Sequence, residues 1–143
     1  MMMLRIYDEP GQFSMLNSTS LKIYLILNEK LITQTLDEFL SRLDYQVITL
    51  HSIEELHQVL RNQSKDGALI ICGQRCFRGS EQAIIRNLYE QNHRVHFIVI
   101  TEDAPELSMP EAISLGIYGY LHKPISLAEL ELLLVRLNEK NQE

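Results

Sequence analysis

The order in which short apolar runs and amphipathic stretches alternate restricts the fold more than any other feature of the sequence. The predicted strands, each a short apolar run, cover residues 21–27, 45–50, 68–72, 95–100 and 118–121. The predicted helices, identified by apolar spacing or by a cap motif, cover residues 30–43, 52–60, 80–92, 110–116 and 126–140. Strands and helices that alternate through short connections favour an α/β fold, with a doubly wound, five-stranded parallel sheet.

Residues 1–20 lie outside this alternation. They show no sustained periodicity and contain Pro10, Gly11 and a cluster of Ser, Thr and Asn at 17–20. We therefore expect residues 1–20 to form a flexible N-terminal extension. Residues 21–140 are expected to form one domain, because 143 residues are enough for a single core.

Charge and composition exclude several classes of partner. The net charge of −6 disfavours direct binding of nucleic acid. No apolar run approaches the roughly 18 residues that span a bilayer, and the N-terminus does not resemble a signal peptide, so we expect a cytoplasmic protein. The only cysteines, Cys72 and Cys76, and the scattered histidines do not form a zinc-binding pattern.

The ends of the predicted strands select the candidate site residues. In a doubly wound sheet, ligands bind beyond the carboxyl ends of the strands. The residues at or just beyond four of these ends are Asn28 and Glu29, Cys72 and Gly73, Thr101, and Lys123.

Two segments at these positions resemble a known family. The segment FIVITE ends the fourth strand with Thr101, and AISLGIYGYLHKPISLAEL carries an aromatic residue, a Lys-Pro pair and a closing helix. Together they resemble the CheY-like receiver domain of response regulators, over about residues 21–140. The resemblance implies a flavodoxin-like (βα)5 fold and a non-enzymatic role in two-component or phosphorelay signal transduction.

The resemblance also implies a phosphorylation site from which this sequence departs. Working receivers hold Mg²⁺ with two acidic residues after the first strand and an Asp after the third, and that Asp accepts the phosphoryl group. Here the first acidic position is Asn28, and the acceptor position falls on Gly73 or Cys72. We therefore expect a degenerate pocket with no catalytic residue, no cofactor and weak or absent Mg²⁺ binding, with Glu29 as at most one anionic ligand.

The remaining pocket residues have structural interpretations. Lys123 is expected to pair with Glu29, and Thr101 to end its strand as a β-branched residue. The resemblance implies a cis peptide bond before Pro124 and makes Tyr120 either a switch that turns inward or outward or a permanent part of the core. Cys72 is expected to be a small buried residue.

The second cysteine, Cys76, could be either an inert loop residue or a reactive thiol. Cys76 lies between Arg75 and Arg78, and nearby cations lower the pKa of a thiol. An inert loop cysteine is the favoured interpretation over a redox role.

Three functions remain open. The favoured one is a receiver-like module that acts through protein contacts without phosphorylation, as found in transcription regulators and other multidomain signalling proteins. The second is a flavodoxin-like domain that binds a flavin or a nucleotide, although no glycine-rich loop is present. The third is a receiver phosphorylated at an atypical residue.

The last helix predicts where a partner binds. Its inward face is expected to carry Leu130, Leu133, Leu134 and Leu137, which follow a helical period. That leaves Leu127, Leu132 and Val135 toward the flank or solvent, and exposed apolar residues often mark a contact surface. We expect a homodimer through this helix and the fifth strand, or docking of a fused output domain.

Overall fold

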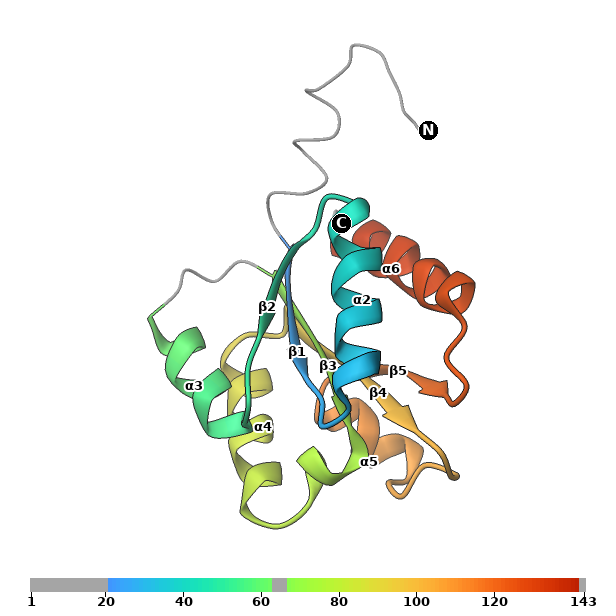
Figure 1. Ribbon diagram of the computed structural model, residues 1–143. Coiled ribbons are helices and arrows are strands. Elements are labelled where there is room, and N and C mark those ends of the chain that lie inside the picture. Colours follow the sequence, from blue (N-terminus) through green and yellow to red (C-terminus); the bar gives the residue numbers. More distant parts are fainter. Residues whose placement is uncertain (1–20, 63–66, 142–143) are drawn as a thin grey trace.

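Five parallel strands form the centre of the molecule. The computed structural model describes residues 21–62 and 67–141. The strands are β1 (Leu21–Ile26), β2 (Gln46–Thr49), β3 (Gly67–Gly73), β4 (Val95–Thr101) and β5 (Ile117–His122). They lie in the order β2-β1-β3-β4-β5, and every neighbouring pair is parallel (Figure 1). This sheet confirms the predicted doubly wound α/β fold.

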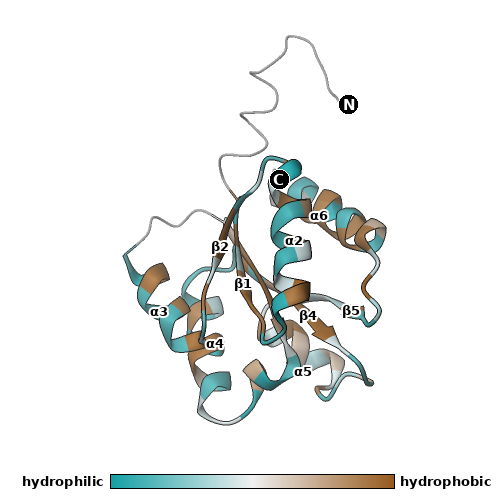
Figure 2. Ribbon diagram, in the orientation of Figure 1, coloured by the Kyte–Doolittle hydropathy of each residue, from teal (hydrophilic) through white to brown (hydrophobic). Residues whose placement is uncertain are grey.

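Helices cover both faces of the sheet. They are α2 (Lys30–Arg42), α3 (Ile53–Arg61), α4 (Ser80–Gln91), α5 (Met109–Ser114) and α6 (Leu127–Asn141), with a short 3-10 helix, η1 (Gln74–Phe77), after β3. Apolar residues of α2 and α6 share one core cluster with the sheet, and those of α3 and α4 share the other. Figure 2 shows largely hydrophobic strands between helices in which hydrophobic and hydrophilic residues are mixed.

Strands β3 and β4 are central because their side chains suit burial on both faces. Successive side chains of a strand point to opposite faces. In β3, Leu69 and Ile71 therefore join the cluster beneath α2 and α6, whereas Ile70 and Cys72 join the cluster beneath α3 and α4. A strand buried on both faces needs a continuous apolar run, and residues 68–72 form such a run in the sequence.

The helix ends explain where the connections turn. Ser52 and Ser126 each accept a hydrogen bond from the backbone N–H three residues later, at 3.1 Å in both cases, as their cap motifs predicted. Gly116 ends α5 with φ of 85°, and a Cβ there would lie 2.7 Å from Cδ1 of Tyr89. A residue with a side chain would therefore be strained and would clash at this position.

The structure differs from the expectation in details. Most element boundaries shift by one or two residues, and η1 was not predicted. Ser108 forms a full capping box with Glu111, which starts α5 at Met109 and not at Pro110. Among residues 21–62 and 67–141, no helix is both long and apolar enough to span a membrane. The expected N-terminal extension, residues 1–20, lies outside the described residues.

Candidate functional site

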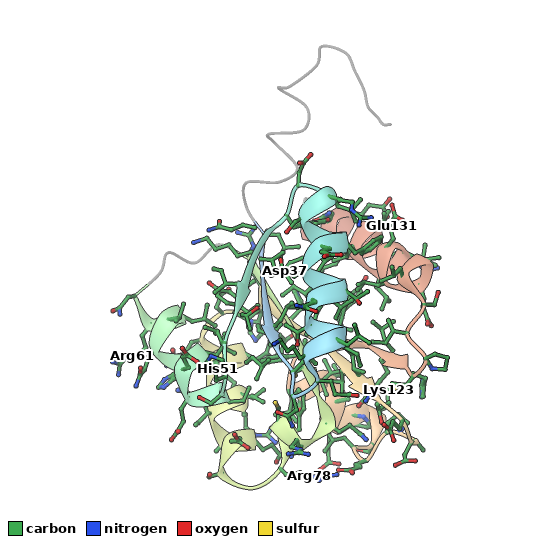
Figure 3. The ribbon with its side chains drawn as sticks, in the orientation of Figure 1. Asp37, His51, Arg61, Arg78, Lys123 and Glu131 are labelled. Atoms are coloured by element: carbon green, nitrogen blue, oxygen red, sulfur yellow. The ribbon has the colours of Figure 1, made fainter. Side chains whose placement is uncertain are left out.

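The carboxyl ends of β1, β3, β4 and β5 meet around one cleft. Its volume is about 570 Å³. Five of the predicted site residues line it, namely Asn28, Glu29, Gly73, Thr101 and Lys123. In Figure 3, the labelled Lys123 and Arg78 lie in the lower part of the view, where these strand ends meet. The sixth predicted residue, Cys72, is fully buried as a member of the core, as its position in an apolar strand suggested.

The ammonium group of Lys123 is paired with two carboxylates. Nζ donates a hydrogen bond to Oε1 of Glu29 and another, of 3.2 Å, to Oε2 of Glu102. These bonds raise the pKa of Lys123, chiefly through Glu29 and despite some opposing desolvation. The predicted pairing with Glu29 is therefore present, and Glu102 joins it from the loop after β4. The positive charge of Lys123 is largely neutralised by groups of the protein itself.

The hydroxyl group of Thr101 uses all of its hydrogen-bonding capacity within the protein. Oγ1 donates to the carbonyl oxygen of Asp103 at 3.0 Å. It accepts from the backbone N–H of Asp103 at 3.1 Å and from Nε2 of Gln74 at 2.8 Å. A hydroxyl has one donor and two acceptor sites, so no position remains for another ligand. Thr101 is also buried, with 4 % of its surface exposed.

Gln74 connects η1 to the loop between β4 and α5. While its Nε2 binds Thr101, its Oε1 accepts a hydrogen bond of 2.7 Å from the backbone N–H of Glu106. The Glu106 side chain in turn binds Arg78 through two hydrogen bonds, one of them 3.0 Å from Nε to Oε1. This ion pair lowers the pKa of Glu106 and raises the pKa of Arg78. The loop is thus held to η1 by one amide and one ion pair.

Cys72 and Cys76 lie close together at the end of β3, where Cys76 packs against the core cluster that contains Cys72. Their side chains are hydrogen-bonded, Cys72 is fully buried, and Cys76 is half-buried and lines the cleft. The bond to Cys76, together with burial, raises the pKa of Cys72 well above its ordinary value. The same bond lowers the pKa of Cys76 despite the opposing effects of burial and Glu81.

The lowered pKa of Cys76 has a different main cause from the one predicted. The sequence suggested the neighbouring cations, but the bond from Cys72 is the largest cause and Arg75 is the smallest. Arg78 instead pairs with Glu106. The backbone N–H of Gly73 contributes a further hydrogen bond that favours the thiolate of Cys76.

The donor set at the strand ends does not fit a magnesium ion. Mg²⁺ needs several oxygen ligands, preferably anionic. Strand β3 ends in a thiol and a glycine, and the carboxylate of Glu29 is paired with Lys123. No group of three or more metal-ligating side chains occurs in the part of the chain that the structure describes. Weak or absent Mg²⁺ binding remains a prediction.

The two other positions implied by the resemblance lie beside the cleft. The Lys123–Pro124 peptide bond is cis. Tyr120 is half-buried, packs against the core cluster that contains Phe77 and Phe97, and lines a small cavity with Gln74. Burial raises the pKa of the Tyr120 phenol. The ring therefore lies inward in this structure.

Helix α6 divides the predicted interface residues into two groups. Leu132 and Val135 are 49 % and 48 % exposed. Leu127, which was expected toward the flank or solvent, lies at the flank, where it is half-buried and packs against the core cluster. Of the inward set, Leu130, Leu134 and Leu137 are buried and Leu133 is half-buried against Gly119.

Comparison with known proteins decides the family. The response regulator receiver domain family matches residues 23–134, which is most of the chain. The chain belongs to the response regulator receiver family. The predicted resemblance is confirmed, and a receiver is favoured over a flavin- or nucleotide-binding domain. Receivers are in general signalling modules and not enzymes.

Solved structures show the same fold. The receiver domain of the TMAO respiratory response regulator TorR has a TM-score of 0.68 at 22 % identity, covering 83 % of this chain and 97 % of that one. A receiver domain from an HD domain-containing protein of Pseudomonas fluorescens has a TM-score of 0.66 at 25 % identity, covering 85 % and 97 %.

A longer structure and the curated sequences complete the comparison. The response regulator StyR has a TM-score of 0.66 at 14 % identity, and the match covers 87 % of this chain but only 63 % of StyR. No curated protein sequence matches this receiver.

The sequence did not identify all the residues that shape this receiver's site. Gln74, Arg78, Asp103 and Glu106 bind to each other or to Thr101, although none belongs to the family's phosphorylation motif. Their only signal in the sequence is position, because all four follow the strands that end at the cleft.

Proposed function

We propose that this receiver acts through protein contacts and does not use an aspartyl-phosphate switch. The end of β3, where working receivers carry the acceptor Asp, holds Cys72 and Gly73. Neither residue offers a carboxylate to a phosphoryl donor. Under this proposal the chain is a receiver of a two-component or phosphorelay protein. Its cleft keeps one arrangement and does not change through phosphorylation.

The hydrogen bonding of Thr101 is the observation that carries this proposal. In the family, the Thr hydroxyl and the Lys ammonium bind the phosphoryl oxygens. In this protein the Thr101 hydroxyl is saturated by Gln74 and Asp103, and Lys123 is paired with two carboxylates. A phosphoryl group would have to displace these partners, and each lost hydrogen bond costs about 1 kcal/mol, or more where a charge takes part.

A second copy of the chain is the proposed partner, bound through α6 and β5. The exposed Leu132 and Val135 lie on α6, and β5 is an edge strand of the sheet. Helix α5, which also packs on β5, exposes Met109 and Ile113 to 76 % and 61 %. Apolar side chains on both helices beside one edge favour a self-complementary contact, the commonest arrangement in homodimers. A fused output domain is the alternative occupant of this surface.

Two further features belong to the proposal. We place the protein in the cytoplasm, since its free thiols suit a reducing compartment. Control of transcription is one output open to such a receiver, through a domain beyond the receiver itself.

Treatment with acetyl phosphate and Mg²⁺ tests the absence of phosphorylation. A working receiver treated in parallel serves as the positive control. Intact-mass spectrometry should show a gain of one phosphate for the control and no change for this protein. A phosphate on this protein, mapped to any residue around the cleft, would overturn the proposal and favour an atypical phosphoacceptor.

A further inference from the structure

The one pair of contacting thiols in the described residues, Cys72 and Cys76, has no role in the proposed function. Cys72 is the penultimate residue of β3, and Cys76 lies in η1, which follows the strand directly. The turn from strand to 3-10 helix packs Cys76 against the core cluster that contains Cys72, four residues earlier in the chain. A disulfide needs the Cβ atoms of its two cysteines to lie close together, and the packing of Cys76 against the cluster that contains Cys72 favours that approach.

The environments of the two sulfur atoms differ in a way that suits stepwise oxidation. Cys76 lines the cleft, so a small solute can reach it. Its thiolate is favoured by hydrogen bonds from the Cys72 thiol and from the backbone N–H of Gly73. Cys72 is fully buried and keeps its proton. A reachable thiolate beside a protected thiol is the arrangement of an attacking cysteine and a resolving cysteine.

We propose that Cys72 and Cys76 are an oxidation site that forms a reversible disulfide within one chain on reaction with hydrogen peroxide. In the first step the Cys76 thiolate attacks one peroxide oxygen. The O–O bond breaks, the leaving hydroxide takes up a proton to become water, and Cys76 becomes a sulfenic acid. The sulfur of Cys72 then attacks the sulfur of Cys76. The S–O bond breaks and the proton of Cys72 leaves with the hydroxide as a second water.

The disulfide would act on the element that organises the cleft. Gln74 and Cys76 share η1, and Phe77 of the same helix packs edge-on against Phe97 with ring centroids 5.4 Å apart. A bond from Cys76 to Cys72 would fix η1 covalently to β3. The hydrogen bonds of Gln74 to Thr101 and Glu106 start from that helix. The proposal rests on the two thiols alone and does not depend on whether the receiver binds a phosphoryl group.

Peptide mapping can test the proposal sharply, because Arg75 lies between the two cysteines. The reduced, full-length protein is treated with increasing hydrogen peroxide, free thiols are alkylated, and the protein is digested with trypsin. Cleavage after Lys65, Arg75 and Arg78 puts Cys72 in residues 66–75 and Cys76 in residues 76–78. We expect these two peptides to appear joined, with the loss of two hydrogens, and to separate again after treatment with dithiothreitol.

Two variants control for other thiol chemistry. Cys76→Ser should form no linked peptide, and its buried Cys72 should resist both peroxide and alkylation in the folded protein. Cys72→Ser should leave Cys76 reactive but unresolved, so that it accumulates as higher oxides. If Cys72→Ser does not fold, Cys76→Ser and the wild type still decide the result. Loss of Cys76 to higher oxides without a linked peptide in the wild type would overturn the proposal. A disulfide between two copies, seen as a dimer on a non-reducing gel, would do so as well.

Discussion

At the scale of single residues, Gln74 links two separate parts of the cleft. Its amide reaches two groups that lie 27 and 32 residues further along the chain, the Thr101 hydroxyl and the Glu106 N–H. A glutamine in so short a helix has no spacing or composition that signals such a role. Both bonds are part-buried or at the cleft rim, so they help to set the position of the β4–α5 loop.

Gln74→Met tests this role, because it keeps the length of the side chain and removes both hydrogen bonds. We expect a loss of about 1–2 kcal/mol in the free energy of unfolding, measured by urea denaturation. Amide NMR shifts should change at residues 101–107. Gln34→Met, at an exposed position of α2, is the matched control and should change neither quantity. Equal effects of the two substitutions would contradict the role given to Gln74.

The ion pair between Arg78 and Glu106 predicts a pH dependence. Arg78 lowers the pKa of Glu106 in the folded protein. A carboxyl group whose pKa is lower in the folded state stabilises the protein above its unfolded pKa, and this stabilisation is lost as the pH falls through the folded pKa. Both side chains are exposed, so the effect is small.

The wild type should therefore be more stable than Glu106→Gln at neutral pH, and the difference should disappear as the solution is acidified below the ordinary pKa of glutamate. Thermal unfolding of both proteins across this range measures it. Glu38→Gln, whose carboxylate lies 4.0 Å from Arg42, is the control and should show a smaller difference. A difference that grows on acidification would show that the pair does not act as described.

Residue-level chemistry was only partly predictable from the sequence. Lys123 and Glu29 could be paired in advance, because both follow strands whose carboxyl ends meet at one edge. The contact between Cys72 and Cys76 could not, because it depends on η1. Residues four apart lie far from each other in an extended strand and approach only where the chain turns, and this turn has too few residues to show a period.

At the scale of elements, long segments with a clear periodicity could be located from the sequence, whereas short segments could not. The apolar run of β3 and the helical spacing of α6 located both elements to within a residue at each end. The four residues of η1 and the polar start of α5 left no comparable pattern. The extent to which Leu127 is buried could not be predicted, since a helical period gives the direction of a side chain but not how closely its neighbours pack.

Helix α6 gives the prediction that belongs to this scale. Leu132→Glu should weaken association of the protein by about tenfold or more, because it places a charge in an apolar contact. The melting temperature should hardly change, since the side chain is already 49 % exposed. Sedimentation equilibrium measures the association constant.

Leu31→Glu is the matched control for this substitution. Leu31 is a leucine of α2 that is 75 % exposed and lies outside the proposed interface. It should leave association unchanged. A wild-type protein that stays monomeric at high concentration would contradict the homodimer.

At the scale of the whole molecule, the fold is that of a receiver, and we predict that its cleft binds Mg²⁺ weakly or not at all. Anything that binds only the folded state raises the midpoint of unfolding. Millimolar MgCl₂ should therefore raise the melting temperature no more than NaCl of equal ionic strength does. Calorimetric titration gives a second measurement, and a dissociation constant in the low millimolar range or tighter would contradict the prediction.

The central position of β3 in the sheet also affects how often different parts of the molecule open. Strands paired on both sides and buried on both faces open only when the whole molecule unfolds, whereas short peripheral turns open more often. Cys72 belongs to such a strand, and Cys76 belongs to a short 3-10 helix at its end. Of the two sulfur atoms, one thus lies in the slowest-opening part of the molecule and the other in a part that can open locally. A disulfide between them would hold η1 to β3 and so make its local opening rarer.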